Sequence, residues 1–365
     1  MIYLTHLKER HLFPGGNTNK GFYSFYKYIL TQEDANRIIC MKGGPGTGKS
    51  SLMKKVGAHF KSKGYTIEYH HCSSDNNSLD GIVIKELGLA ILDGTSPHMV
   101  DPIHPGAVDE ILNMGIALNN DALSLHKREI IDISKNISNN FQRAYRFLSS
   151  AKSIHDDWSK LNSKALDYSK IVTITESLKE GIFNKQKAGF GDERHLFATA
   201  FTPNGIITFA NDLTSEFNHK FILKGGPGFS KTTILTEIGK VAQKKGYFVE
   251  YMHDPFIPER IEHIFIPELS TCVVTENEIS QSSFNGKVYN IEDFCDASIL
   301  SNNKEDIDYD KKIFYELTNK ALYFISEAHK LHDDLEAYYI NAIDFKMLDK
   351  IYDDVIQKFE KYIPQ

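Results

Sequence analysis

The hydrophobic positions of this chain follow the same order twice. Short apolar runs typical of strands surround one helical stretch in each half, at 37–41, 66–72, 81–84 and 89–93 around 51–63, and at 219–223, 248–253 and 271–275 around 233–239. Alternating strands and helices predict an α/β fold, with a parallel sheet flanked by helices. The ligand site of such a sheet is expected at the carboxyl ends of its strands.

Long amphipathic helices are predicted after the strands of each half. Apolar residues from Leu317 to Phe345 alternate spacings of four and three, and a series from Ala144 to Tyr168 repeats them 321 − 144 = 177 residues earlier. This heptad seam predicts two helical arms, at about 107–187 and 306–363, that pack against each other or against their own domain.

The two halves also match residue by residue. A gapless alignment of 41–71 with 223–253 contains 13 identities in 31 positions, and Arg-His-Leu-Phe occurs at 10–13 and again at 194–197. We therefore expect two tandem domains of ordinary size, 1–187 and 188–365, each carrying one arm.

A glycine-rich loop follows the first strand of the repeat. Residues 42–50 read Lys-Gly-Gly-Pro-Gly-Thr-Gly-Lys-Ser between a strand-type run and a helix, the setting of a phosphate-binding loop (P-loop, or Walker A motif). Glycines let consecutive N–H groups surround a phosphate, Lys49 adds a positive charge, and the Ser50 hydroxyl is a ligand for Mg²⁺. The residues expected to bind nucleotide are Gly43, Gly44, Pro45, Gly46, Thr47, Gly48, Lys49, Ser50 and Ser51.

The same loop recurs 231 − 49 = 182 residues later with one altered glycine, because Ser230 stands where the first loop has Gly48. If the backbone there needs a positive φ, a Cβ costs about 1–2 kcal/mol and the side chain crowds the phosphate, which would weaken binding about tenfold. Weak or regulatory binding and a structural relic are both open. The candidate contacts in this loop are Gly225, Gly226, Gly228, Ser230, Lys231, Thr232 and Thr233.

An acid ends one apolar run of the first half. Residues 89–93 read Leu-Ala-Ile-Leu-Asp, the form of a Walker B strand, whose acid holds Mg²⁺ directly or through water. Asp93 and Ser50 are therefore the candidate Mg²⁺ ligands, and Lys49 and Asp93 are candidate catalytic residues. The matching run of the second half ends in Thr275, with Glu276 as the alternative acid, so hydrolysis is expected at the first site.

Two more candidate catalytic acids lie in the segment 70–80. A carboxylate after the second strand can position or deprotonate a phosphate acceptor in P-loop kinases, a role that Asp75 or Asp80 would fill; the alternative is a solvated turn. His70 and His71 are adjacent on a strand and point to opposite faces, so no joint metal site is expected. The His-Asp-Asp triplets at 155–157 and 332–334 are expected on solvated helix faces.

Each half keeps an arginine some thirty residues before its loop, at Arg10 and Arg194. If the halves associate about a pseudo-two-fold axis, Arg194 would reach the nucleotide of the other half as an arginine finger. A structural salt bridge is the alternative.

Composition narrows the class of protein. The 365 residues are 41% hydrophobic with a net charge of −6, and neither an 18-residue apolar run nor a signal-peptide pattern is found. The four cysteines have no metal-ligand spacing, which is typical of a reducing cytoplasm. We expect a cytoplasmic protein with no membrane partner and no globally basic nucleic-acid surface.

The paired Lys-Gly-Gly-Pro-Gly loops, with Arg-His-Leu-Phe before each, resemble those of a group of bacterial tandem P-loop ATPases. The resemblance spans nearly the whole chain, and it implies the P-loop NTPase fold and ATP binding at 43–51. Ser230 and Thr275 depart from the general P-loop pattern, which places the second site in doubt.

The leading interpretation is an ATP-binding protein with Mg²⁺-dependent hydrolysis at the first site, a weak or regulatory second site, and arms that respond to the nucleotide or bind a protein partner. A small-molecule or nucleoside kinase and a nucleotide-gated scaffold without turnover are the alternatives. ATP is favoured over GTP, because the Asn-Lys-Glu-Asp at 303–306 follows no apolar strand.

Overall fold

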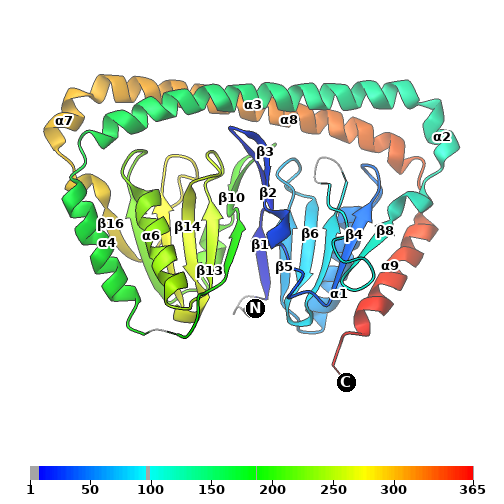
Figure 1. The fold of residues 1–365 in the computed structure, drawn as a ribbon. Coiled ribbons are helices and arrows are strands. Elements are labelled where there is room, and N and C mark those ends of the chain that lie inside the picture. Colours follow the sequence, from blue (N-terminus) through cyan, green and yellow to red (C-terminus); the bar gives the residue numbers. More distant parts are fainter. Residues whose placement is uncertain (1–7, 96–98, 186, 365) are drawn as a thin grey trace. The chain divides into compact units, whose positions relative to one another are not determined.

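The computed structural model describes residues 8–95, 99–185 and 187–364, which form two compact units (Figure 1). Unit 1 comprises Met1–Gly15, Ser24–Gln142 and Phe324–Gln365, and unit 2 comprises Gly16–Tyr23 and Arg143–Tyr323. The units are thus not the two consecutive halves of the chain, since each contains helices that belong to the other half of the sequence.

Each unit contains one six-stranded mixed sheet, and the two sheets have the same topology (Figure 1). In unit 1 the order is β1-β5-β6-β7-β4-β8, and in unit 2 it is β9-β13-β14-β15-β12-β16. The bounds in unit 1 are Glu9–Leu12 (β1), Arg37–Lys42 (β4), Ile67–His71 (β5), Leu79–Ile84 (β6), Leu89–Asp93 (β7) and Asp109–Asn113 (β8). Those in unit 2 are Glu193–Leu196 (β9), His219–Lys224 (β12), Val249–His253 (β13), Ile261–Ile266 (β14), Thr271–Glu276 (β15) and Lys287–Asn290 (β16).

The predicted parallel sheet is correct for five strands of each unit and wrong for the sixth. β6 runs antiparallel to β5 and β7, and β14 runs antiparallel to β13 and β15. Short links explain this difference, because only residues 72–78 and 85–88 join β6 to its neighbours. A parallel pair needs a crossover of about a dozen residues or more, so these links permit only antiparallel pairing.

Nine helices are found in the described residues, together with five short 3₁₀ turns and two small hairpins. The helices are Lys49–Ser62 (α1), Asn120–Leu125 (α2), Lys127–Ser163 (α3), Tyr168–Ile182 (α4), Ala210–Thr214 (α5), Lys231–Lys244 (α6), Ala297–Asn302 (α7), Lys304–Ile340 (α8) and Phe345–Glu360 (α9). The hairpins are Gly15–Thr18 with Gly21–Ser24 (β2, β3) and Thr199–Thr202 with Gly205–Thr208 (β10, β11).

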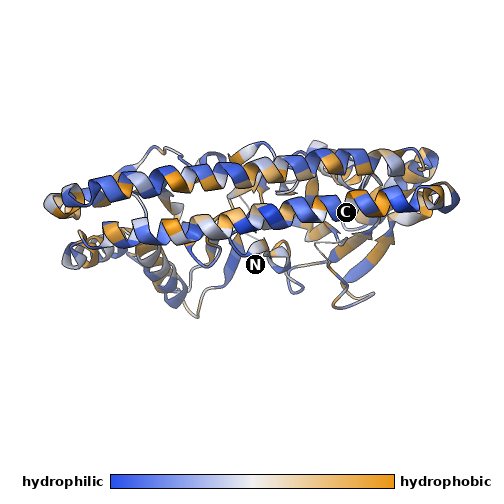
Figure 2. Ribbon diagram, turned by 90° about the horizontal axis from the view of Figure 1, so that it is seen from above, coloured by the Kyte–Doolittle hydropathy of each residue, from blue (hydrophilic) through white to orange (hydrophobic). Residues whose placement is uncertain are grey.

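The predicted arms are the long helices α3 and α8 with the helices that follow them. Hydrophobic and hydrophilic residues alternate along both long helices (Figure 2). The division between the units falls within α3 and within α8. No helix in the described ranges combines the length and apolarity needed to cross a bilayer.

The last helix of each arm packs into the core of the unit whose sheet comes from the other half of the sequence. In unit 1, α9 buries Ile351, Val355 and Phe359 against α1, where the rings of Phe359 and Phe60 lie 6.3 Å apart. In unit 2, α4 contributes Leu178 to the core beside α6. Burial of these aliphatic and aromatic side chains stabilises each unit by about 1.5–3 kcal/mol per residue. The arms therefore do not fold back on the sheet of their own half.

Candidate functional site

The first P-loop connects β4 to α1. Gly46 and Gly48 adopt φ of 67° and 80°, in the left-handed region, where a residue with a side chain would be strained. Lys49 begins α1 and donates from Nζ to the carbonyls of Gly43 at 2.9 Å and Gly44 at 2.8 Å. Thr47 Oγ1 also donates to the Gly44 carbonyl. The loop is thus closed around its own lysine, with the amino end of α1 beside it.

Asp93 ends β7, the strand next to β4, and pairs in register with Met41. Its Oδ2 lies 3.6 Å from Lys49 Nζ, and its Oδ1 accepts from the Thr95 amide at 2.9 Å. Ser50 accepts a hydrogen bond at Oγ from the Leu79 amide at 3.1 Å. The parallel pairing of two strands therefore brings together the lysine and the acid that the sequence indicates.

Helices from the end of the chain lie directly on this loop within unit 1. The amide of Gly46 donates to Oε1 of Glu336 at 3.1 Å. A Cβ at Gly44 would lie 2.5 Å from the ring of Tyr339, and one at Gly48 would lie 3.1 Å from Leu348. The Gly46 amide, one of the groups predicted to bind phosphate, is thus held by a carboxylate of α8, and glycine at 44 and 48 lets Tyr339 and Leu348 approach the loop closely. Pro45 and Ser51 are the remaining residues predicted to bind nucleotide here, and in the described part of the chain their side chains make no hydrogen bond or ion pair.

Asp75 and Asp80, the two acids predicted to act on a phosphate acceptor, differ from Asp93 in their surroundings. Asp75 accepts hydrogen bonds from the Asn77 amide and the Ser78 hydroxyl, which is the turn given as the alternative. Asp80 is buried beside Tyr26, and burial, followed by the charge of Asp80, raises the pKa of that phenol. A role in phosphate transfer remains a prediction for both acids.

The second P-loop keeps the backbone of the first. Gly228 and Ser230 adopt φ of 85° and 54°, which match the signs at the equivalent glycines. The condition for strain at Ser230 is therefore met. A Cβ in this left-handed conformation costs about 1–2 kcal/mol. The expected tenfold loss of affinity at this loop stays a prediction.

Other contacts of the second loop repeat those of the first. Lys231 donates from Nζ to the carbonyls of Gly225 and Gly226, the latter at 2.7 Å. Asn162 of α3 donates from Nδ2 to the Pro227 carbonyl at 2.8 Å, so a helix of the first arm covers this loop. Thr232 donates to the Ile261 carbonyl at 3.3 Å, and Thr233 is exposed.

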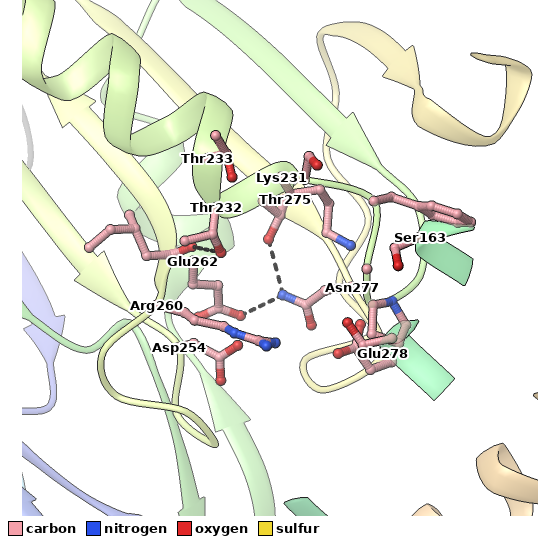
Figure 3. A pocket seen from close by; sticks show the side chains of 16 residues that line it. Ser163, Lys231, Thr232, Thr233, Asp254, Arg260, Glu262, Thr275, Asn277 and Glu278 are labelled. Carbon is pink, nitrogen blue, oxygen red and sulfur yellow. Dashed lines mark hydrogen bonds between the residues drawn. The ribbon is translucent and has the colours of Figure 1, made fainter. Parts of the chain in front are cut away.

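A cavity of about 330 Å³ opens beside the second loop (Figure 3). The P-loop forms one wall, and Ser159 and Ser163 of α3 form another. The ends of three neighbouring strands supply the polar residues Asp254, Arg260, Glu262, Thr275, Asn277 and Glu278. Thr275 pairs in register with Leu223, the position that Asp93 holds relative to Met41. Thr275 thus occupies in unit 2 the place that Asp93 has in unit 1, and Glu276 does not line the cavity.

The acids of this cavity differ in their protonation. Burial alone would raise the pKa of Glu278, but the hydrogen bond with His155 and the charge of Lys231 lower it to about 2. Burial and then the charge of Asp254 raise the pKa of Glu262 to about 8, and burial raises that of Asp254. Burial also lowers the pKa of Lys231. Glu278 is therefore ionised at neutral pH, whereas Glu262 carries a proton.

The two repeated arginines form ion pairs inside their own units. Arg10 is buried and contacts Glu68 at 2.8 Å, and Arg194 contacts Glu250 at 3.2 Å. Both contacts match the structural salt bridge that the sequence left as the alternative. The arginine-finger role of Arg194 stays a prediction.

Sequence reasoning missed several residues that the fold brings to the loops. His155 was expected on a solvated face, but it is buried and its Nε2 lies 2.6 Å from Oε1 of Glu278. His332 and Asp333 were not expected to converge, yet their ligand atoms and that of His329 lie within 4.8 Å of one another. No sequence motif marks Glu336. Only the 177-residue shift between the arms points to it, because that shift aligns Glu336 with Ser159, which lies beside the second loop.

Comparison with known proteins gives a short match. Residues 23–84, which include the first P-loop, match the family model of the nephrocystin 3 N-terminal region. Searches of curated proteins and of solved structures found no match. The similarity therefore concerns one segment, almost all of it in unit 1, that contains β4, α1, β5 and β6.

Proposed function

We propose that this chain is a tandem P-loop protein that binds ATP and hydrolyses it with Mg²⁺ at the first loop. The observation that carries the proposal is the 3.6 Å approach of Lys49 Nζ to Asp93 Oδ2, made by two adjacent parallel strands. A lysine at the start of a helix and an acid at the end of the neighbouring strand are the pair that phosphate binding with a divalent cation needs.

In this proposal each residue of the first site has a role that follows from its chemistry. The backbone N–H groups of Gly44 and of residues 46–50, together with the ammonium group of Lys49, bind the phosphates, since the amino end of α1 carries a partial positive charge. Ser50 and Asp93 offer a hydroxyl and a carboxylate, the oxygen ligands that Mg²⁺ prefers, so they fit this ion. Mg²⁺ would supply charge neutralisation on the phosphates.

The helical arms are the second part of the proposal. Each loop is covered by a helix from the other half of the sequence, with Glu336 on Gly46 and Asn162 on Pro227. A nucleotide at the first loop would compete with Glu336 for the Gly46 amide, so the arm that carries Glu336 would respond to nucleotide and present that change to a protein partner. The free thiols of all four cysteines fit a cytoplasmic location.

Binding and turnover of ATP by the full chain test this function. Lys49→Ala removes a charged donor worth about 1.5–3 kcal/mol, so affinity at the first site should fall about 10- to 100-fold and ADP release should stop. Lys61→Ala is the matched control, because Lys61 lies on the same helix and pairs with Glu9 instead. The function is wrong if wild-type protein retains no ATP with Mg²⁺, or if Lys49→Ala binds and hydrolyses it normally.

A further inference from the structure

The cavity beside the second loop has lost one acid and gained two. Thr275 replaces Asp93, but Asp254 and Glu278 stand at the positions of Cys72 and Ser96 after the shift of 182 residues. Glu262 corresponds to Asp80 and keeps a carboxyl group there. A P-loop that had only lost its function by mutation would not be expected to keep three carboxyl groups around its lysine, because burying each of them costs free energy.

Glu278 and Asp254 each have an oxygen left for a ligand, and Oε2 of Glu262 likewise accepts no hydrogen bond from the described residues. Glu278 has only 9% of its side chain exposed; its Oε1 contacts His155, and no described residue donates a hydrogen bond to its Oε2. Asp254 accepts the amides of Phe256 and Ile257 with Oδ1 alone. Both residues line the cavity, on the side that Figure 3 shows below Lys231 and Asn277. A buried carboxylate oxygen without a donor is the kind of group that a cation satisfies.

We propose that the cavity of unit 2 binds a divalent cation together with the phosphate groups of a nucleotide. The loop amides and Lys231 hold the phosphates, and the cation is shared by these phosphates, the Thr232 hydroxyl and the carboxylates of Glu278 and Asp254, in part through water. The inference rests on the proposed function, because it takes the second loop as a phosphate site.

Cation dependence follows from the charges around the loop. The carboxyl groups of Glu278 and Asp254 line the same cavity as Lys231, and a carboxylate there repels a bare polyphosphate. A divalent cation reverses this repulsion, since Mg²⁺ and Mn²⁺ bind carboxylate and phosphate oxygens and keep several of their waters. The second loop thus differs from the first in the source of its acids and not in the ability to bind.

The experiment counts bound Mn²⁺ by electron paramagnetic resonance as Mn²⁺ and ADP are titrated into the full chain. Lys49→Ala weakens nucleotide binding at the first site about 10- to 100-fold, and this variant should still bind one Mn²⁺ with ADP as tightly as the second site of the wild type does. Adding Glu278→Gln should weaken that Mn²⁺ binding at least about tenfold, as loss of a group that supports a metal typically does. Binding of ADP in EDTA should stay equal or improve, because one repelling charge is gone.

Glu276→Gln in the same background is the matched control, since Glu276 accepts the Phe284 amide outside the cavity and should leave Mn²⁺ binding unchanged. The inference is overturned if Lys49→Ala binds no Mn²⁺ with ADP, or if Glu278→Gln leaves it intact. Equal loss of ADP with and without metal would assign Glu278 a structural role through His155 and would also overturn it. Lys231→Ala separates the two proposals, because nucleotide binding to this variant tests the first site alone.

Discussion

The backbone N–H of Gly46 donates a hydrogen bond of 3.1 Å to the carboxylate of Glu336. These residues are 290 positions apart in the sequence and come together because the end of α8 lies on the first P-loop within unit 1. The amides of this loop are the groups that would bind phosphate. The carboxylate of Glu336 therefore occupies a position that the phosphate of the proposed nucleotide would need.

Glu336→Gln should strengthen nucleotide binding at the first loop. The variant replaces a charge-assisted hydrogen bond by a neutral one, a change of about 1 kcal/mol or a few-fold in affinity, and removes a carboxylate that repels phosphate. Titration with a fluorescent ATP analogue measures the effect. Glu327→Gln serves for comparison, because Glu327 lies on the same helix and pairs with Lys330. Weaker binding by Glu336→Gln would mean that Glu336 assists the nucleotide instead of excluding it.

Ser230→Gly should stabilise the folded chain. The substitution removes left-handed backbone strain of about 1–2 kcal/mol. The greater conformational entropy of glycine in the unfolded state offsets about 0.4–1 kcal/mol of this gain in stability. Unfolding in urea should show a net gain of roughly 0.5–1 kcal/mol. The converse change, Gly48→Ser, places a side chain at φ 80° against Leu348 and should destabilise the chain. A lower stability for Ser230→Gly would show that its hydroxyl matters more than the strain.

Phe359→Ala should destabilise unit 1 by about 3–5 kcal/mol, the usual cost of deleting a buried aromatic ring. Phe359 is fully buried and meets Phe60 of α1, although it lies almost at the end of the chain. Phe345→Ala on the same helix is the control, since its side chain is 61% exposed. Calorimetry that found the two variants equally stable would contradict the packing of α9 on unit 1.

The stability of the chain should fall as the pH decreases from about 6.5 to 4. His71 and His253 each donate from Nδ1 to a backbone carbonyl, so their neutral Nε2 accepts from the neighbouring histidines His11 and His195. Burial lowers the pKa of both His71 and His253 from 6.5 to about 4. The unfolded chain therefore binds more protons in this range, and acid favours unfolding.

Melting temperatures measured between pH 7 and pH 4.5 test this dependence. His253→Gln keeps a donor and an acceptor but cannot titrate, so its melting temperature should fall less steeply with acid than that of the wild type. Identical slopes for the two proteins would show that other groups govern the acid transition. Glu278, with a pKa of about 2, loses its contribution only at lower pH, below about 4.5.

The sequence by itself determined the duplication, the strand-loop-helix units and the position of each P-loop lysine. Local periodicity and glycine spacing specify these features, because they depend on neighbours within a few residues. The pairing of Lys49 with Asp93 was also predictable, since Asp93 ends one apolar strand and the loop that leads to Lys49 follows the carboxyl end of another. The same local pattern located Thr275 at the equivalent end in the second half.

Only the tertiary structure decided which sheet each arm covers. The heptad seam is the same in both copies, so an arm fits its own half and the other half equally well by pattern, and the buried contacts of Leu178 and Phe359 select the other one. Glu336 at the first loop and the His155–Glu278 pair at the second follow from that choice. Contacts between residues over a hundred positions apart depend on packing energy, which no local pattern contains.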